Sequence, residues 1–472
     1  MTTEIPFDNT YARLPEAFFV RQYPVPVRAP RLVAFNADLA KLLRVAPGDL
    51  EDMAQVFSGN TQPSGAEPIA QLYSGHQFGH YNPQLGDGRA VLLGETIGTD
   101  GQRRDIQLKG SGRTPFSRQG DGRAWLGPVL REYVVSEAMY ALGIPTTRAL
   151  AAAETGETVL REAPMPGAIL TRVASSHLRV GTFQIFAARG DIDSLKQLTD
   201  YAIARHYPEV SGPMGLLAAV RDAQARLIAG WMSVGFIHGV MNTDNCAISG
   251  ETIDYGPCAF VDTYHPHTVY SSIDRMGRYA YGNQPDIAVW NLAQFATALI
   301  QQSEDRDAAV EEATQIVHAM PGILQQEWLS RFRAKLGLTR EEQQDSDLIA
   351  DLLTRMAQNQ ADFTNTFRAL ATPDARDQFT DPTAFDSWAE NWRARTQDEA
   401  DPIGVLTRAN PAFIPRNHRI EQMIQAAVAG DYAPFERLNT VLARPYEDQP
   451  EHSDLQRPPS ESEVVQATYC GT

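Results

Sequence analysis

Several features that define common protein classes are scarce in this sequence. Its 472 residues hold three cysteines, Cys246, Cys258 and Cys470, and no CxxC pair, which argues against a disulfide framework and against a zinc ribbon. No stretch approaches about 18 consecutive apolar residues, so we expect no membrane-spanning helix. Positive charge is also in short supply. The 41 basic and 58 acidic residues give a net charge of −17, which argues against general binding of nucleic acids.

The N-terminal segment, from Met1 to Asp8, lacks a basic stretch followed by an apolar one. It therefore resembles neither a secretory signal nor an arginine-rich transit peptide. Together with the low cysteine content, this predicts a cytoplasmic location. The large negative net charge favours a monomer.

What is present is the composition of a globular protein, with 43% hydrophobic and 21% charged residues. The length allows two or three domains. Between about residues 84 and 173, short alternating runs separated by Gly, Asp and Pro predict strands. One helix interrupts them, because apolar residues recur every three or four positions from Leu130 to Leu142. The strand-like runs are 90–93, 106–109, 158–160 and 168–170.

The pattern is mainly helical after about residue 191. Apolar stripes run from Leu216 to Val234 and from Val289 to Ile300, and a strand-like island at 246–255 interrupts the helices and predicts a short hairpin. This order predicts an α+β protein with a two-lobed, protein-kinase-like fold. The N-terminal lobe would hold a mixed sheet and one prominent helix, and the C-terminal lobe would be mainly helical.

We therefore expect three regions. Residues 1–190 would form the N-terminal lobe with an N-terminal extension, and residues 191–445 the helical lobe with a catalytic loop and a metal site. Residues 446–472 are polar and rich in proline, so they would form a flexible tail that carries Cys470.

The clearest chemical motif follows the first long helix of the second lobe. It reads His238-Gly239-Val240-Met241-Asn242-Thr243-Asp244-Asn245, and Asp254-Tyr255-Gly256 comes shortly after it. Kinases place an H-x-D-x-x-x-x-N loop before a D-F-G triplet, whose Asp binds Mg²⁺ together with the Asn of the loop. Here both metal ligands are present, as Asn245 and Asp254. Val240 stands where the proton-accepting Asp should be, and Asp244 is the nearest carboxylate that could replace it.

A second set of candidates lies upstream. Lys109 ends a predicted strand, where kinases carry their phosphate-binding lysine, and Glu132 lies in the following helix, where kinases carry its ion-pair partner. Position alone leaves Glu137 open as the partner. Glycine–arginine turns surround Lys109, and such turns suit close approach to phosphate, although none forms a complete phosphate-loop motif. The turns are 86–89, 110–113 and 120–123, and Arg172 and Arg179 add further cations.

Taken together, these motifs closely resemble those of the selenoprotein O family, in its cysteine-containing bacterial form. The likeness runs from near the N-terminus to the tail. The segments that carry it are 73–79, 85–90, 107–112, 121–124, 238–245 and 253–257. The resemblance implies a kinase-like protein adenylyltransferase that transfers AMP from ATP to Ser, Thr or Tyr hydroxyls of other proteins and releases pyrophosphate.

The resemblance also implies roles for individual residues. Asp244 would be the catalytic proton acceptor, Asn245 and Asp254 would hold Mg²⁺ or Mn²⁺, and Glu132 would pair with Lys109. The remaining residues, together with Asp254, would bind the nucleotide: Gly86, Gly88, Arg89, Lys109, Asp121, Gly122, Arg172 and Arg179. Attack at the α-phosphorus builds charge on the β- and γ-phosphates, so more cations than one lysine are needed there.

In some family members a residue at the position of Cys470 forms a disulfide with a cysteine downstream of the D-F-G-like triplet. Near that place this sequence has Tyr270, and Cys258 is the alternative partner.

Three other functions stay open. They are transfer of UMP from UTP with Mn²⁺, conventional phosphoryl transfer with Asp244 as a shifted base, and a pseudokinase that only binds nucleotide.

Overall fold

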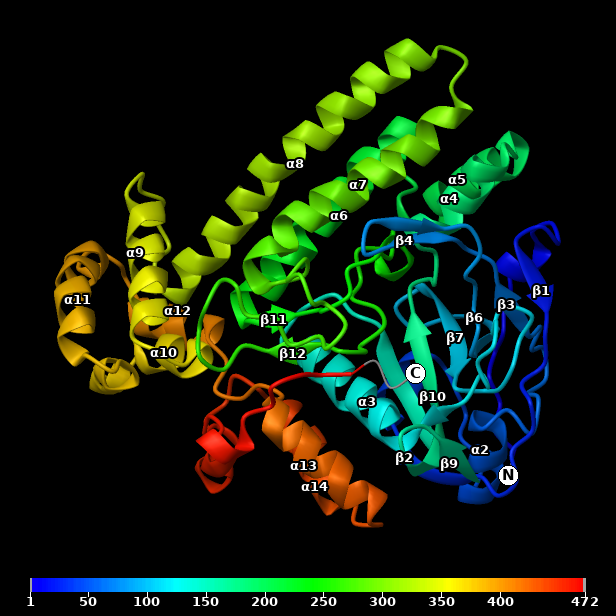
Figure 1. Ribbon diagram of the computed structural model, residues 1–472, viewed down its shortest axis with the longest axis horizontal. Coiled ribbons are helices and arrows are strands. Elements are labelled where there is room, and N and C mark those ends of the chain that lie inside the picture. The colour runs from blue at the N-terminus through cyan, green and yellow to red at the C-terminus, as the bar shows by residue number, and fades with distance from the viewer. Residues whose placement is uncertain (1, 470–472) are drawn as a thin grey trace.

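The computed structural model describes residues 2–469, and its N-terminal region is built around one antiparallel sheet (Figure 1). The strand order is β1-β3-β6-β7-β10-β9-β2, and β8 pairs with β10. The strands are β1 (Phe19–Arg21), β2 (Arg31–Phe35), β3 (Ile69–Gln71), β6 (Ala90–Ile97), β7 (Arg103–Lys109), β8 (Ala124–Trp125), β9 (Arg148–Leu160) and β10 (Pro164–Ala174). A mixed sheet was expected, but each pairing between these strands is antiparallel. Tight turns join β6 to β7 and β9 to β10, and such turns connect antiparallel strands.

The two faces of this sheet pack against different helices. Adjacent residues of a strand point to opposite faces, so Leu92 and Leu93 enter two separate cores. One core lies under α1 (Ala37–Leu42) and α2 (Leu50–Phe57). The other lies under α3 (Leu126–Ala141), which is the helix expected from the apolar spacing around Leu130. Helices α13 (Asn417–Val428) and α14 (Ala433–Leu442) cover the far side of α3 (Figure 1).

The rest of the chain is mainly helical, as the sequence predicts. The helical part begins with α4 (Val180–Arg189), before the boundary expected at residue 190. This helix packs on α7 (Gln284–Leu299) through Phe183 and Phe295, whose ring centroids are 4.9 Å apart. The remaining helices are α5 (Ile192–His206), α6 (Gly212–Val234), α8 (Arg306–Lys335), α9 (Asp345–Gln358), α10 (Phe363–Ala369), α11 (Pro382–Thr396) and α12 (Pro402–Ala409). These findings confirm the α+β class, with a sheet-rich N-terminal region and a helical C-terminal region.

The prediction of strands over 246–255 is wrong. This segment makes only two isolated bridges, through Ala247 to Arg179 and through Thr252 to Thr146. The short ladder of the helical part instead joins β11 (Phe236–Ile237) to β12 (Ala259–Phe260), on either side of the expected island. The apolar residues of the island are buried between other segments, so burial without a continuous partner strand explains their strand-like pattern.

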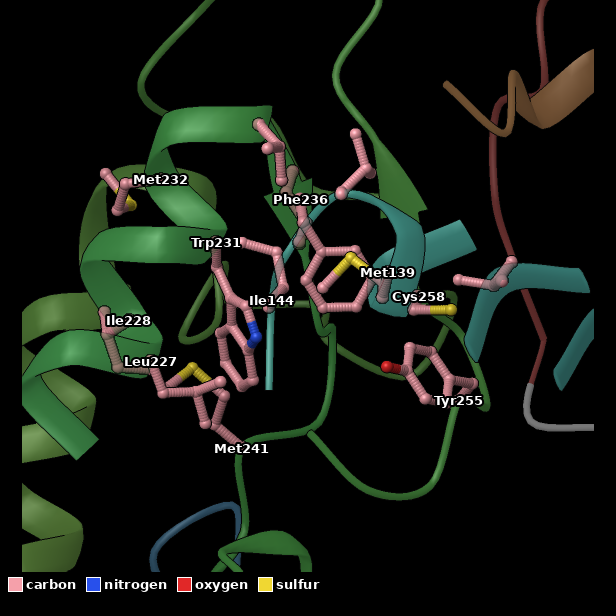
Figure 2. Close-up of a cluster of buried hydrophobic side chains, with 14 of the residues drawn as sticks. Met139, Ile144, Leu227, Ile228, Trp231, Met232, Phe236, Met241, Tyr255 and Cys258 are labelled. Carbon is pink, nitrogen blue, oxygen red and sulfur yellow. The ribbon is translucent and has the colours of Figure 1, made fainter. Parts of the chain in front are cut away.

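A shared core joins the two regions of the chain. Figure 2 shows Ile144, just after α3, beside Trp231 of α6, and Met139 of α3 beside Phe236 at the end of the same core. The indole Nε1 of Trp231 donates to Thr252 Oγ1 at 2.8 Å, which ties α6 to the loop before Asp254. This core therefore links the helix that carries Glu132 to the segments that carry both predicted metal ligands.

The segment from residue 446 to 469 packs against the body of the protein. Tyr446 Oη donates to the Leu142 carbonyl oxygen at 3.0 Å, and Thr468 Oγ1 donates to the Pro257 carbonyl oxygen at 2.6 Å. Cys470 lies outside the described residues, so its predicted role is not addressed by the structure. The flexibility expected for 446–472 stays a prediction.

Candidate active site

Strand β7 directs Lys109 towards α3. Its residues Ile106 and Leu108 are buried in the core under α1 and α2, so the alternating Gln107 and Lys109 face the other way. Lys109 Nζ lies 2.6 Å from Glu132 Oε2 of α3. The competing candidate, Glu137, binds Arg148 at 2.6 Å on another part of the same helix. The structure thus resolves the ambiguity in favour of the Lys109–Glu132 pair.

Arg172 joins this pair from the neighbouring strand. Register in the sheet sets Arg172 of β10 opposite Gln107 of β7, and Arg172 Nη2 donates to Gln107 Oε1 at 2.6 Å. Its other terminal nitrogen, Nη1, lies 3.3 Å from Glu132 Oε1. Arg172 is buried. Its guanidinium is held in one position because Gln107 of β7 and Glu132 of α3 bind its two terminal nitrogens.

Asp254 is the point at which the cations converge. Its Oδ1 lies 2.7 Å from Lys109 Nζ and 2.6 Å from Arg172 Nη1, and its Oδ2 lies 3.4 Å from Arg179 Nη2. Burial alone would raise the pKa of Asp254, but the charges of Arg172, Lys109 and Arg179 outweigh burial and hold the pKa well below its usual range. Asp254 has a φ of 62°, in the left-handed region, so this carboxylate sits on a strained turn.

Arg179 stands at the start of α4 and is also buried. Its guanidinium carbon lies 4.4 Å from the centre of the Tyr73 ring, and Nη1 lies 3.6 Å from Asp87 Oδ1. Asp87 also accepts hydrogen bonds from the Gln71 amide nitrogen at 3.1 Å and from Gln107 Nε2 at 3.2 Å. Burial raises the pKa of Asp87 to about 6 despite the nearby Arg179. The cluster of Lys109, Arg172 and Arg179 is therefore fixed in place by a surrounding set of acceptors.

The loop after β11 contains the predicted kinase-like motif. His238 Nε2 lies 2.8 Å from the Ile253 carbonyl oxygen, and its Nδ1 accepts from the Val240 amide nitrogen at 3.3 Å. The ring stacks on Trp231, and burial lowers the pKa of His238. These contacts give His238 a structural part, connecting the loop to the segment before Asp254. Val240 is itself buried and offers no group that can accept a proton.

Asp244 is a buried carboxylate with one unused oxygen. It lies in a single 3₁₀ turn, Thr243–Asn245, and its Oδ2 accepts from Gln77 Nε2 at 3.0 Å. Its Oδ1 is buried without a hydrogen-bond partner among the described residues. Burial raises the pKa of Asp244 to about 6, and Gln77 opposes this rise only in part. A carboxylate with these properties is suited to take a proton near neutral pH.

A small hairpin holds this loop in position. Strands β4 (Gly75–Gln77) and β5 (His80–Asn82) form it, and the His76 amide nitrogen donates to Thr243 Oγ1 at 2.7 Å. The Phe78 amide nitrogen donates to Asn242 Oδ1 at 3.1 Å. At position 75 a Cβ atom would lie 2.9 Å from Asp244 Oδ1, so the glycine lets the hairpin approach closely. Segment 73–79 is one of those that carry the family resemblance, but the sequence did not indicate these contacts, because an amide side chain or a backbone donor gains its role only from the fold.

The glycine–arginine turns divide into two groups in the structure. Gly86 and Gly88 pack against Phe116 beside Asp87, and the Arg89 guanidinium makes no hydrogen bond or ion pair with the described residues. Asp121 instead binds Arg161 at 2.8 Å and is largely exposed. Gly122 has a φ of 69°, and a Cβ there would lie 2.2 Å from the backbone of Gly112. Asp121 and Gly122 therefore lie in a turn that packs against Gly112, apart from the turn that contains Gly86 and Gly88. A role of Asp121 and Gly122 in nucleotide binding stays a prediction.

The predicted metal ligands supply an amide and a carboxylate. Asn245 Nδ2 donates to the Val240 carbonyl oxygen at 3.0 Å, which leaves its Oδ1 as the oxygen that can bind a cation. Among residues 2–469 no cluster of three or more His, Cys, Asp or Glu side chains has the geometry of a metal site. Mg²⁺ fits this sparse set of oxygens, because it commonly binds one or two protein ligands together with substrate phosphates.

The candidate redox residue Cys258 is buried just after the Asp254 turn. Thr468, two residues before Cys470 in the sequence, lies next to it against Pro257. The disulfide that the resemblance implies would involve Cys470 and so lies outside the described residues.

Among the described residues, no helix is both long and apolar enough to traverse a bilayer.

Buried cations around one carboxylate are a feature of enzymes that act on the phosphates of a nucleotide. Comparisons with known proteins agree. Residues 2–443 match the family described as "Protein adenylyltransferase SelO". Proteins called "Protein nucleotidyltransferase YdiU" from Ruegeria pomeroyi, Ruegeria sp. strain TM1040 and Roseobacter denitrificans are 77%, 69% and 65% identical, each over the full length of both chains.

The chain belongs to the SelO family and is a nucleotidyltransferase.

Proposed function

We propose that this protein transfers AMP from ATP to Ser, Thr or Tyr hydroxyls of proteins and releases pyrophosphate. The observation that carries the proposal is the cluster of Lys109, Arg172 and Arg179 around Asp254. A conventional kinase reaction needs one such lysine, because the terminal phosphoryl group leaves the nucleotide. Transfer of AMP instead leaves charge on a departing pyrophosphate, which three buried cations suit well.

In this proposal Lys109, Arg172 and Arg179 bind the two departing phosphates. Glu132 holds the Lys109 ammonium and the Arg172 guanidinium in place, since its two oxygens contact both. Gln107 fixes the second branch of the Arg172 fork. Positioned cations in a site shielded from water stabilise developing charge with little reorganisation.

Asp244 takes the proton of the attacking hydroxyl. Its free Oδ1 is the accepting atom, and Gln77 fixes the carboxylate through Oδ2. A pKa of about 6 leaves it mainly ionised at neutral pH and makes it a stronger base than an ordinary Asp. The hydroxyl of a protein side chain is the natural acceptor for such a group.

Asn245 and Asp254 would hold the divalent cation, Mg²⁺ or Mn²⁺, through Oδ1 of the amide and through the carboxylate. Such a cation, when bound, lowers the charge of the phosphates and makes the α-phosphorus easier to attack. Asp254 is already surrounded by three cationic groups in this structure, so binding a metal ion requires these groups to shift towards the phosphates.

The decisive experiment incubates the purified chain and a generic protein acceptor with Mg²⁺ and ATP labelled at either the α- or the γ-phosphorus, and follows both label and intact mass. We expect an AMP increment and α-label on protein. The Asp254→Asn variant should lose the transfer, whereas the exposed Asp377→Asn substitution should leave it unchanged.

Label from the γ-position would show a phosphotransferase and refute the proposal. Binding of ATP without any transfer would show a pseudokinase. A parallel reaction with UTP and Mn²⁺ tests the other nucleotide, and preferred transfer of UMP would replace the AMP assignment.

A further inference from the structure

A cavity lies away from the candidate active site, where α6, α8 and α12 meet the end of α3. Its volume is about 400 Å³, which is within the range of small-molecule sites. Leu142 and Ile144, just after α3, form one wall, and Ser233 and Val234 at the end of α6 form another. The remaining walls come from α8, from α12 and from Tyr446.

The charge of this cavity is one-sided. Arg331 and Lys335 of α8 line it, one helical turn apart and so on the same face of that helix, and Arg408 lines it from α12. Its lining contains no Asp or Glu. Arg408 is largely exposed and pairs with Asp401 at 3.3 Å, so the basic groups of this cavity that lack an acidic partner among the described residues are Arg331 and Lys335. In a chain with a net charge of −17, two such groups in one cavity form an unusual local environment.

Arg331 lacks a partner for its charge. Its Nε is buried without a hydrogen-bond partner among residues 2–469. The group lies against the α6 backbone, since a Cβ built on Gly230 would be 3.7 Å from Arg331 Cζ. A buried donor without an acceptor is unfavourable, so a guanidinium in this position gains from a bound oxygen ligand.

Lys335 is a second cation without a nearby carboxylate. Its side chain is buried, and its Nζ lies 2.8 Å from Asn410 Oδ1 and 4.3 Å from the centre of the Phe367 ring. Burial lowers the pKa of Lys335 to about 7. By contrast, Arg395 of α11 is also buried but binds Asp345 at 2.8 Å and Glu399 at 2.9 Å.

We infer that this cavity is a binding site for a small phosphorylated molecule. The unpaired Arg331 guanidinium, the buried Lys335 amine and the exposed Arg408 at the edge favour an anionic ligand, and a phosphate supplies both the charge and the oxygens that a guanidinium fork binds in pairs. The apolar walls formed by Leu142, Ile144 and Val234 suit the organic part of such a molecule. The site is separate from the nucleotide site of the proposed function and does not depend on it.

The location of the cavity gives the ligand a route to the active site. Leu142 and Ile144 directly follow the helix that carries Glu132, and Val234 directly precedes β11 and the loop with Asp244. Tyr446 Oη, which donates to the Leu142 carbonyl oxygen, connects the C-terminal segment to the same point. A ligand in the cavity would therefore contact both segments that position the reacting groups.

The test uses inorganic phosphate as the probe and the full-length chain. Phosphate is titrated against sodium chloride at matched ionic strength while the melting temperature is followed, and hydrogen exchange is measured for the peptides that contain residues 142–146 and 230–235. We expect a saturable rise in melting temperature with phosphate and slower exchange in both peptides. The exchange measurement separates this site from phosphate bound near Arg172.

Three variants make the test specific. Arg331→Gln should weaken phosphate binding about 10- to 100-fold, the range expected when a charged hydrogen-bond donor is lost. Arg408→Gln should weaken it less, because this side chain is largely exposed and already pairs with Asp401. Arg393→Gln removes the same charge from an exposed position on α11 and should leave binding unchanged. Equal affinity in the Arg331 and Arg393 variants, or unchanged exchange in both peptides, would overturn the inference.

Discussion

The raised pKa of Asp244 predicts that this residue destabilises the fold. Its carboxylate is 9% exposed and ionises only at about pH 6, against an ordinary value of 3.8. At neutral pH the folded protein therefore holds a buried charge that the unfolded chain keeps in water. The difference between the two pKa values corresponds to roughly 3 kcal/mol. Asp244→Asn keeps the shape and an acceptor for Gln77, so we expect it to raise the free energy of unfolding by about this amount.

The pH dependence of this gain has a definite sign. Below about pH 4 the carboxyl group is protonated in both states, so the wild type and the variant should be equally stable. Between about pH 4 and 6 the unfolded chain loses its proton first, and the stability of the wild type falls relative to the variant. Above about pH 6 the folded protein is ionised too, and the difference stays constant.

Urea unfolding at a series of pH values between 4 and 7.5 measures this difference. The exposed Asp377→Asn variant is the matched control and should track the wild type. A difference for Asp244→Asn that does not change with pH would contradict the reasoning, as would a loss of stability at pH 7. The same variant should lose nucleotidyl transfer, so a gain in stability would accompany a loss of activity.

Three further predictions concern the site and its supports. The kcat of nucleotidyl transfer should fall about tenfold per pH unit below about pH 6, where Asp244 is protonated, and a rate that is flat from pH 5 to 8 would exclude it as the base. Glu132→Gln should lower the free energy of unfolding by about 1–3 kcal/mol in urea, less than for an isolated buried pair because Asp254 still faces the lysine. Gly181→Ala would set a Cβ 2.0 Å from a backbone carbonyl oxygen of the hairpin segment and should destabilise the fold by about 1–3 kcal/mol, whereas Gly322→Ala, with open space inside a helix, should stabilise it by about 0.5–1 kcal/mol.

The helices were the most predictable part of the fold. The spacing around Leu130 and the glycine at 143 predicted α3, which begins at Leu126 and ends at Ala141. Although α3 is buried on more than one face, its strongly apolar residues still recur every three or four positions, so the helical period is visible in the sequence. The prediction of strands at 246–255 was wrong for a different reason. Its buried residues contact several unrelated segments in turn, and alternation then says nothing about a partner strand.

The candidate site was predictable only where charge and motif mark it. Asp254 and Lys109 were found from their motifs, but the spacing in the sequence could not decide between Glu132 and Glu137. That choice depends on which turn of α3 faces β7, and hence on packing between distant elements. Gln77 and Gln107 were missed because a glutamine gains its role only from the register and from the close approach of the hairpin.

The three-cation contact at Asp254 has a consequence for the order of binding. A divalent ion that binds alone must compete with Lys109, Arg172 and Arg179 for the Asp254 carboxylate, and these three cations are then left without that anionic partner. A triphosphate that arrives with the ion supplies new oxygens to all three, so the exchange is close to balanced in charge. Under the proposed function, metal and nucleotide should therefore show strong positive thermodynamic linkage, with weak uptake of the free ion and tight uptake of the pair.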